Sequence, residues 1–226
     1  PTPFSAYLEM AGGTLLSLSP ERFIEVQNGR VETRPIKGTR PRGSTPQLDQ
    51  ELAEELQRCE KDRAENLMIV DLLRNDLGRS CEPGSIRVPE LFSLESYPNV
   101  HHLVSVVQGQ LAAQHSPLSL LTAAFPGGSI TGAPKGRAMQ IIAELEQQSR
   151  GAYCGALGWL GADGACDLNV MIRTASLVRS GRGWDVEVRS GGAITIDSDP
   201  QSELEETRHK AAAKLGYTDD LGNLVD

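Results

Sequence analysis

The hydrophobic and polar positions at the start of the chain alternate in short runs, and a period of two is typical of β-strands. Turn sequences separate the runs: Gly12-Gly13 lies between the first two, and Asn28-Gly29 lies between the next two. An Asn-Gly pair between alternating runs is a strong hairpin signal, because both residues accept the positive φ of a tight turn. The predicted strands of these two hairpins are residues 6–10, 14–18, 23–27 and 30–33.

The pattern changes to a helical one after residue 46. Leu48, Leu52 and Leu56 recur every four residues, and apolar positions continue to Leu73, which predicts helix over residues 47–79. Further along, the pattern predicts strands over residues 100–111, 153–160, 168–178 and 184–188, and helices over residues 118–124, 134–146 and 201–215, the last ending at Gly216. Because strands and helices occur in clusters, we predict an α+β fold with largely antiparallel β-sheets packed with outer helices, in one domain over residues 1–226.

Residues 34–43, Arg-Pro-Ile-Lys-Gly-Thr-Arg-Pro-Arg-Gly, fit neither pattern. Two prolines fix φ and remove backbone donors, while two glycines permit positive φ, so the segment is predicted to be a shaped loop. Its lysine, Lys37, is a candidate nucleophile once the amine has lost its proton. The three arginines beside it suit an anionic ligand in a local basic pocket. The alternative is a solvated basic turn.

The composition limits the classes of function. A net charge of −8 argues against non-specific binding to nucleic acid. The four cysteines, Cys59, Cys81, Cys154 and Cys166, have no zinc-binding spacing, so we expect reduced thiols in a cytoplasmic protein. No apolar run approaches the roughly 20 residues that span a bilayer, so neither a membrane segment nor a signal peptide is expected. The sequence starts without methionine, which predicts a piece of a longer chain.

Two predicted helices carry acidic residues at a spacing of three. Asp62 and Glu65 form one pair, and Glu203 and Glu206 form the other. Residues three apart share a helix face, so each pair directs two carboxylates the same way. If the two faces meet, their oxygens suit Mg²⁺, which takes one or two protein carboxylates and leaves room for water and an anionic substrate. The alternative is two solvated helix faces.

Two further candidates are an acid and a histidine near predicted strands. Glu21 follows the first hairpin and is a candidate general acid, although a lone glutamate is most often simply exposed. His101 and His102 open a predicted strand, and adjacent strand residues face opposite sides, so only one of them can face a site. A structural histidine is the alternative.

Arg173 interrupts an otherwise apolar predicted strand. A planar guanidinium among apolar neighbours often binds a carboxylate with two parallel hydrogen bonds. Gly191-Gly192-Ala193 ends the next predicted strand, and its small side chains would let a ligand carboxylate reach backbone N–H groups. Together with the metal site and the cationic segment, these residues predict a pocket for a small dicarboxylate.

Seven stretches of the sequence contain most of these candidates. They are Ser19-Pro20-Glu21-Arg22-Phe23, Pro35-Ile36-Lys37-Gly38-Thr39, residues 62–76, His102-Leu103-Val104-Ser105, residues 125–135, Ile172-Arg173-Thr174 and Glu205-Glu206-Thr207. On these stretches, in order and over nearly its whole length, the chain resembles the chorismate-utilising enzymes. The resemblance implies the fold of that family, incomplete at the N-terminus, because the family's catalytic domain has N-terminal strands and helices that are absent here.

For the acidic pairs the resemblance implies a magnesium site. Glu65 and Glu206 correspond to the two Mg²⁺ ligands of the family, and Asp62 and Glu203 support them from one helical turn away. The required cofactor implied by the resemblance is therefore Mg²⁺.

The resemblance also implies how chorismate is held. Glu21 corresponds to the general acid that protonates the departing C4 hydroxyl, and His102 corresponds to a histidine beside the ring. The implied contacts to the substrate are Gly38, Thr39, Tyr153, Arg173, Gly191, Gly192 and Ala193. Ala193 stands where the family has a glycine, so its methyl group narrows the approach of a carboxylate.

Lys37 divides the family. Anthranilate synthases carry alanine in this position, whereas Lys37 corresponds to the lysine of aminodeoxychorismate synthase large subunits, for which the resemblance implies attack on C2 before ammonia enters at C4. The resemblance therefore implies amination of chorismate at C4, with ammonia from a glutamine amidotransferase subunit, for 4-aminobenzoate and folate synthesis. Two alternatives stay open: an anthranilate synthase component I, and a catalytically inactive fragment or module that only contacts an amidotransferase.

Overall fold

The structure is a computed structural model that describes residues 2–196 and 198–215. Its backbone contacts divide the chain into two compact units. We call the described parts of Pro1–Pro20, Arg150–Gly155 and Met171–Asp226 the four-strand unit, and Glu21–Ser149 with Ala156–Val170 the seven-strand unit, after the sheet that each contains. The single domain expected for residues 1–226 stays a prediction.

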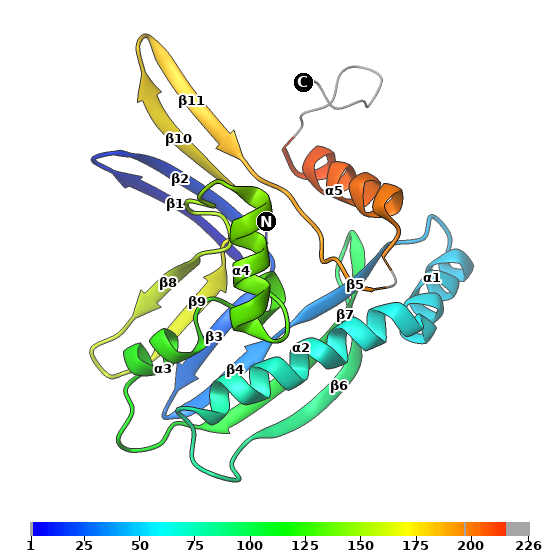
Figure 1. The fold of residues 1–226 in the computed structure, drawn as a ribbon. Helices are drawn as coiled ribbons and strands as arrows, with labels where there is room; N and C mark the ends of the chain where they lie inside the picture. Colours follow the sequence, from blue (N-terminus) through cyan, green and yellow to red (C-terminus); the bar gives the residue numbers. More distant parts are fainter. Residues whose placement is uncertain (1, 197, 216–226) are drawn as a thin grey trace. The chain divides into compact units, whose positions relative to one another are not determined.

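The four-strand unit contains an antiparallel sheet of two hairpins that lie side by side (Figure 1). Its elements are β1 (Phe4–Met10), β2 (Gly13–Ser19), β10 (Thr174–Ser180), β11 (Gly183–Val188) and helix α5 (Pro200–Leu215). The hairpins join where β2 pairs with β10, and there the hydroxyls of Ser17 and Thr174 lie 2.9 Å apart. Helix α5 begins where the Asp199 carboxylate accepts the N–H of Ser202 (2.9 Å), and this bond lowers the pKa of Asp199.

The seven-strand unit is built around the long strand β7, which pairs along both of its edges. Its strands are β3 (Arg22–Gln27), β4 (Arg30–Arg34), β5 (Ile36–Pro41), β6 (Arg87–Ser96), β7 (Val100–Gln110), β8 (Ala156–Leu160) and β9 (Cys166–Val170). The order is β5-β7-β4-β3-β9-β8, with β6 paired to β7, and every pair is antiparallel. Because β6 takes one edge of β7, β4 and β5 follow each other along the other edge.

Helices α1 and α2 pack on this sheet (Figure 1). The helices of the unit are α1 (Pro46–Arg58), α2 (Glu60–Gly78), α3 (Pro117–Ala124) and α4 (Lys135–Glu146), with a 3-10 turn at Gly128–Ile130. The side chains that fill the core between helices and sheet include Ile24, Val26, Val31, Leu56, Ile69, Val70, Leu77, Leu103 and Val107. This apolar contact fixes α2, and with it the acidic residues near its N-terminal end.

Most of the predicted elements are confirmed. Both N-terminal hairpins, strands β7 and β11, helices α3, α4 and α5, and the antiparallel pairing agree with the prediction to within a few residues. The helix predicted over residues 47–79 is divided into α1 and α2 at Cys59, whose backbone is extended (φ −63°, ψ 107°). The α+β fold class is therefore confirmed, while Gly216 lies outside the described residues.

One strand was missed and two predicted strands had wrong bounds. Strand β6 was missed, because register shifts interrupt its pairing with β7 and with it the simple alternation of side chains. The strand predicted over residues 153–160 begins only at Ala156, and Tyr153 lies in a turn. The strand predicted over residues 168–178 is divided into β9 and β10 in different sheets, and Arg173 between them has a left-handed backbone (φ 55°) that does not continue a strand.

The four cysteines are free thiols, as predicted. Burial raises the pKa of Cys81 to about 11, so its thiol stays protonated at neutral pH. None of the helices described is long and apolar enough to cross a lipid bilayer.

Candidate functional site

The predicted site residues are divided between the two units. The seven-strand unit contains Glu21, Lys37, Gly38, Thr39, Asp62, Glu65 and His102. The four-strand unit contains Tyr153, Arg173, Gly191, Gly192, Ala193, Glu203 and Glu206.

Lys37 lies in a β-bulge of an edge strand. Ile36 pairs with Val104 and Thr39 pairs with His102, so Lys37 and its neighbour together face a single residue of β7. Such a bulge re-aims the side chain that it carries and is common beside active sites. The loop predicted for residues 34–43 was therefore wrong, because most of the segment is strand β5. The bulge in this strand includes Gly38, whose φ is positive.

The arginines around Lys37 are neutralised by neighbouring carboxylates. The ion pairs join Arg34 to Glu32 and Glu95, Arg40 to Glu55 and Asp62, and Arg42 to Asp49. Arg42 holds both oxygens of Asp49 (2.7 and 2.6 Å), and this two-pronged contact keeps the pKa of Asp49 well below its usual range. The predicted basic pocket was therefore wrong. Within the described residues, Lys37 is the one cation of the segment that has no ion pair.

Gly38 lets α1 and α2 approach β5 closely. Its φ is 85°, and a Cβ atom at this position would lie 2.7 Å from Leu56 Cδ1 and 2.9 Å from Asp62 Cγ. These distances are shorter than any normal carbon–carbon contact, so only glycine fits without displacing a neighbour. Because Gly38 has no side chain, the Asp62 carboxylate lies directly against it, next to Lys37 in the sequence.

We predict that Gly38→Ala destabilises the protein more than Gly84→Ala. Both glycines have left-handed φ, 85° and 76°, but a Cβ atom at Gly84 would meet nothing within 4 Å. Gly84→Ala is expected to cost only the backbone strain of about 1–2 kcal/mol. Gly38→Ala is expected to cost about 1–3 kcal/mol more, because it also overpacks the core. Urea unfolding of both variants measures the difference, and equal costs would contradict the close packing at Gly38.

The two adjacent histidines have separate partners, as the alternation of a strand predicts. His102 is buried, and its Nδ1 lies 2.9 Å from the hydroxyl of Thr39 on the neighbouring strand. His101 instead contacts Asp49 through Nε2 (3.0 Å) and Ser96 through Nδ1 (2.8 Å). The structure therefore brings together the two predicted site residues Thr39 and His102, while His101 ties α1 to the sheet.

The surroundings of the Asp62 carboxylate on α2 suit a cation beside it. Its Oδ2 is buried and accepts no hydrogen bond from the described residues, although Arg40 Nη2 lies 3.2 Å away in an ion pair. A buried carboxylate oxygen without a hydrogen bond suits an additional positive charge. Glu65 is half-buried one turn further along the same helix. Within either unit, no described group of three or more His, Cys, Asp or Glu side chains is placed to hold a metal ion.

Glu21 is buried just before strand β3. Its backbone C=O accepts the N–H of Val170 (3.1 Å), which extends the pairing of β3 with β9 by one residue. The sequence alternative of a simply exposed glutamate was therefore wrong.

In the four-strand unit, the glycine turn lies against predicted site residues. A Cβ atom at Gly191 would lie 3.0 Å from the Tyr153 hydroxyl, and one at Gly192 would lie 3.4 Å from Glu203 Oε2. Glu203 is buried and accepts a hydrogen bond from the Ser198 hydroxyl (2.6 Å). The structure thus brings together Tyr153, the two glycines and the supporting acid of the predicted metal site.

Two polar residues near the site were missed by the sequence analysis. Lys210 forms an ion pair with Glu206 one turn earlier on α5, so a metal ion at Glu206 has to displace an ammonium group. Asn66 is fully buried on α2, where it donates to the carbonyl of Leu103 (3.3 Å) and accepts from the hydroxyl of Ser105 (2.6 Å). The sequence signal for Lys210 was its spacing of four residues from Glu206, which is typical of a helical ion pair. The signal for Asn66 was a polar residue within the apolar stripe of a predicted helix.

Comparisons with known proteins agree on one family. Residues 1–216 match the family model described as chorismate binding enzyme. Aminodeoxychorismate synthase component 1 of Salmonella typhimurium is 52% identical over 92% of this chain and 45% of that protein. Anthranilate synthase component 1 of Saccharolobus solfataricus is 46% identical over 94% of this chain and 50% of that protein.

A solved structure of similar fold is anthranilate synthase component I from Streptococcus pneumoniae. It has a TM-score of 0.82 and 37% identity, and the match covers 95% of this chain and 46% of that chain. The chain spans about half the length of the component 1 relatives that it matches.

Proposed function

The chain belongs to the family of chorismate binding enzymes, and from this premise we propose that the full-length protein aminates chorismate at C4 to give 4-amino-4-deoxychorismate. The observation that carries the proposal is Lys37. Its amine has no ion pair within the described residues. Lys37 lies in a bulge together with Gly38 and just before Thr39, and both of these residues are implied contacts to the substrate. The 52% identity to an aminodeoxychorismate synthase component 1 supports the same reaction.

In the proposed mechanism, two side chains act on the ring of chorismate. The neutral amine of Lys37 attacks C2, and the C4 hydroxyl leaves as water with a proton from Glu21. Ammonia then attacks C4, the bond between C2 and the lysine nitrogen breaks, and the amine of Lys37 is regenerated. The new C4 ammonium group returns a proton to the Glu21 carboxylate. Chorismate and ammonia thus give 4-amino-4-deoxychorismate and water.

We propose that Glu65 and Glu206 hold Mg²⁺, with Asp62 and Glu203 in support. Asp62 Oδ2 is buried and accepts no hydrogen bond from the described residues, which fits this proposal. When bound, the ion supplies positive charge that binds a carboxylate of the substrate and offsets the charge that develops as the hydroxyl leaves.

The remaining implied contacts are proposed to hold the substrate carboxylates and ring. Arg173 and the hydroxyl of Tyr153 are the donors for a carboxylate, and the turn at Gly191 lets that carboxylate reach backbone N–H groups. His102, held by Thr39, lies beside the ring in this proposal.

The ammonia is proposed to come from a glutamine amidotransferase subunit. Relatives named component 1 of an aminodeoxychorismate synthase support a second component. We propose that the product serves 4-aminobenzoate and folate synthesis. The competing function is that of an anthranilate synthase component I, which the 46% identity to one such enzyme supports.

Product analysis separates the two functions. Full-length protein incubated with chorismate, ammonia and Mg²⁺ is expected to form 4-amino-4-deoxychorismate without pyruvate, measured by liquid chromatography with mass detection. Omission of ammonia and addition of a chelator serve as controls, and each is expected to abolish the product. Anthranilate and pyruvate in equal amounts would reject C4 amination.

A further inference from the structure

Arg22 follows the proposed general acid Glu21, and its guanidinium bonds carboxylates from three strands. Nε and Nη2 donate to the two oxygens of Asp167 on β9, at 3.1 and 3.2 Å. Nη1 donates to Glu25 on β3 (3.3 Å) and to Glu32 on β4 (3.2 Å). A two-pronged guanidinium–carboxylate contact fixes direction as well as distance, so the Arg22 side chain is held in one orientation.

A β-bulge explains how Arg22 reaches these carboxylates. Arg22 pairs with Arg34 and Glu25 pairs with Glu32, so two residues of β3 face one residue of β4. Residues three apart in a regular strand point to opposite faces, but the extra residue of the bulge returns Arg22 to the face of Glu25. Because adjacent residues of an extended chain point to opposite faces, we infer that Glu21, one residue earlier, faces away from Arg22 and Glu25; Glu21 is only 7% exposed.

We propose that Arg22 is a positioning residue for the general acid. Its bonds to three strands hold the bulge, and the bulge directs Glu21 away from the carboxylate network and toward the substrate. This inference rests on the proposed function, in which Glu21 protonates the departing hydroxyl. A misplacement of about 1 Å in a reacting group can cost about 100-fold in rate, so loss of the anchor affects the chemical step more than substrate binding.

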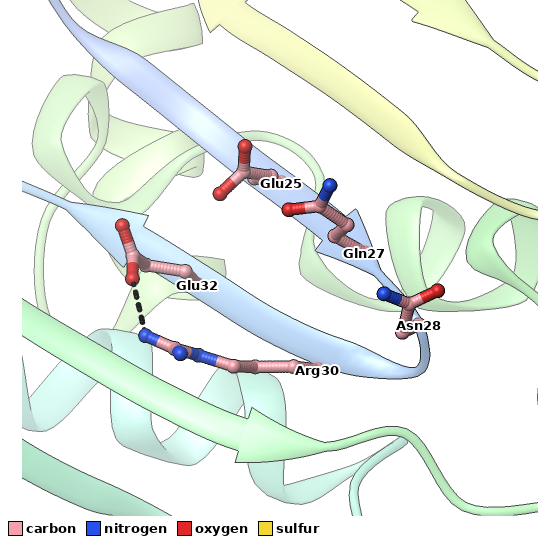
Figure 2. A pocket seen from close by; sticks show the side chains of 5 residues that line it. All are labelled: Glu25, Gln27, Asn28, Arg30 and Glu32. Carbon is pink, nitrogen blue, oxygen red and sulfur yellow. Dashed lines mark hydrogen bonds and ion pairs between the residues drawn. The ribbon is translucent and has the colours of Figure 1, made fainter.

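The same network provides a matched control in Arg30. Figure 2 shows Glu25 and Glu32 on adjacent strands, with Arg30 bonded to Glu32 (3.1 Å); all three residues line a pocket at the β3–β4 hairpin. Arg30 carries the same charge as Arg22 and contacts one of the same carboxylates, but its side chain is 60% exposed and it begins the next strand, β4, instead of following Glu21 directly.

A double-mutant cycle tests the proposal in the full-length enzyme. Chorismate consumption with Mg²⁺ and ammonia is measured for Arg22→Met, Glu21→Gln, the double variant and Arg30→Met. Arg22→Met is expected to lower kcat at least about 10-fold with KM changed less than about 2-fold, while Arg30→Met changes neither. In the Glu21→Gln background, Arg22→Met is expected to lower kcat by less than about 2-fold, because no acid remains to be oriented.

Two results would overturn the proposal. One is an equal loss of kcat from Arg22→Met in both backgrounds, which indicates a general structural role. The other is full kcat in Glu21→Gln, which leaves no acid for Arg22 to position. Consumption is counted whatever the product is, so the identity of the product tests the proposed function separately. If Arg22→Met does not fold, Arg22→Lys replaces it, because lysine keeps the charge without the two-pronged geometry and the same comparison of backgrounds applies.

Discussion

Lys37→Ala is expected to lower the formation of 4-amino-4-deoxychorismate by at least about 100-fold, because it removes the amine that attacks C2. The substitution is expected to leave the fold unchanged. Lys37 is only half-buried, and within the described residues it has no ion pair whose loss would expose a partner charge. Product formation by the full-length enzyme is measured with saturating ammonia, so that supply from a partner subunit does not limit the rate.

Lys37→Arg is the control for this prediction. Arginine keeps the positive charge and the long stem, but its guanidinium stays protonated and cannot serve as the nucleophile. It is therefore expected to be as inactive as alanine, with circular dichroism and a melting temperature close to those of the parent. An arginine variant with near-normal turnover would refute a covalent role and leave Lys37 as an electrostatic contact.

The fold was predictable where periodicity and turn chemistry agree. Asn28-Gly29 between two alternating runs correctly predicted the β3–β4 hairpin, and the four-residue spacing of leucines correctly predicted α1. Prediction failed at strands that contain bulges. The bulge at Lys37-Gly38, together with the nearby prolines and glycines, removes the alternating pattern from β5. Repeated register shifts do the same in β6. Periodicity assumes a regular element, so one extra residue inverts the pattern that it depends on.

The identities of the site residues came from motifs, whereas their environment depends on tertiary structure. The run of arginines around Lys37 suggests a basic pocket, but Arg34 meets Glu95 on β6, 61 residues later, and Arg42 meets Asp49 on the helix that follows. Likewise, nothing local to Glu21 indicates its burial, which follows from pairing with β9 more than a hundred residues later. Spacing predicts which residues share a helix face, but it does not predict which charges cross from one element to another.

Lys135→Met is expected to destabilise the protein by about 3–5 kcal/mol near pH 8, because it leaves a buried charge without its partner. Lys135 joins the start of α4 to α2: its Nζ donates to Asp76 Oδ2 (2.6 Å) and to the carbonyl of Ala124 (2.8 Å). Asp76 is 1% exposed, and its other oxygen, Oδ1, has no hydrogen bond within the described residues. Without Lys135, the Asp76 carboxylate keeps only the weaker charge attraction of Arg79 to offset its lost hydration.

The dependence on pH distinguishes this charge effect from a loss of packing. Burial raises the pKa of Asp76, against the opposing effect of Lys135, so the folded state binds the proton more tightly than the unfolded state. The penalty for the ionised carboxylate is therefore present above the folded pKa and disappears as pH falls through it toward the unfolded value. Without Lys135 the pKa rises further, and the deficit of Lys135→Met is expected to be smaller near pH 5 than near pH 8, as measured by urea unfolding.

The double variant of Asp76→Leu with Lys135→Met removes both charges, and it is expected to recover stability to within about 1–2 kcal/mol of the parent. Apolar side chains of similar size fill the space of a buried ion pair without its cost of dehydration. A double variant as unstable as Lys135→Met, at both pH values, would mean that the stem of Lys135 stabilises the contact between α2 and α4 by packing. In that case the stability lost in Lys135→Met comes from packing of the lysine stem, and the ion pair itself contributes little to the free energy of unfolding.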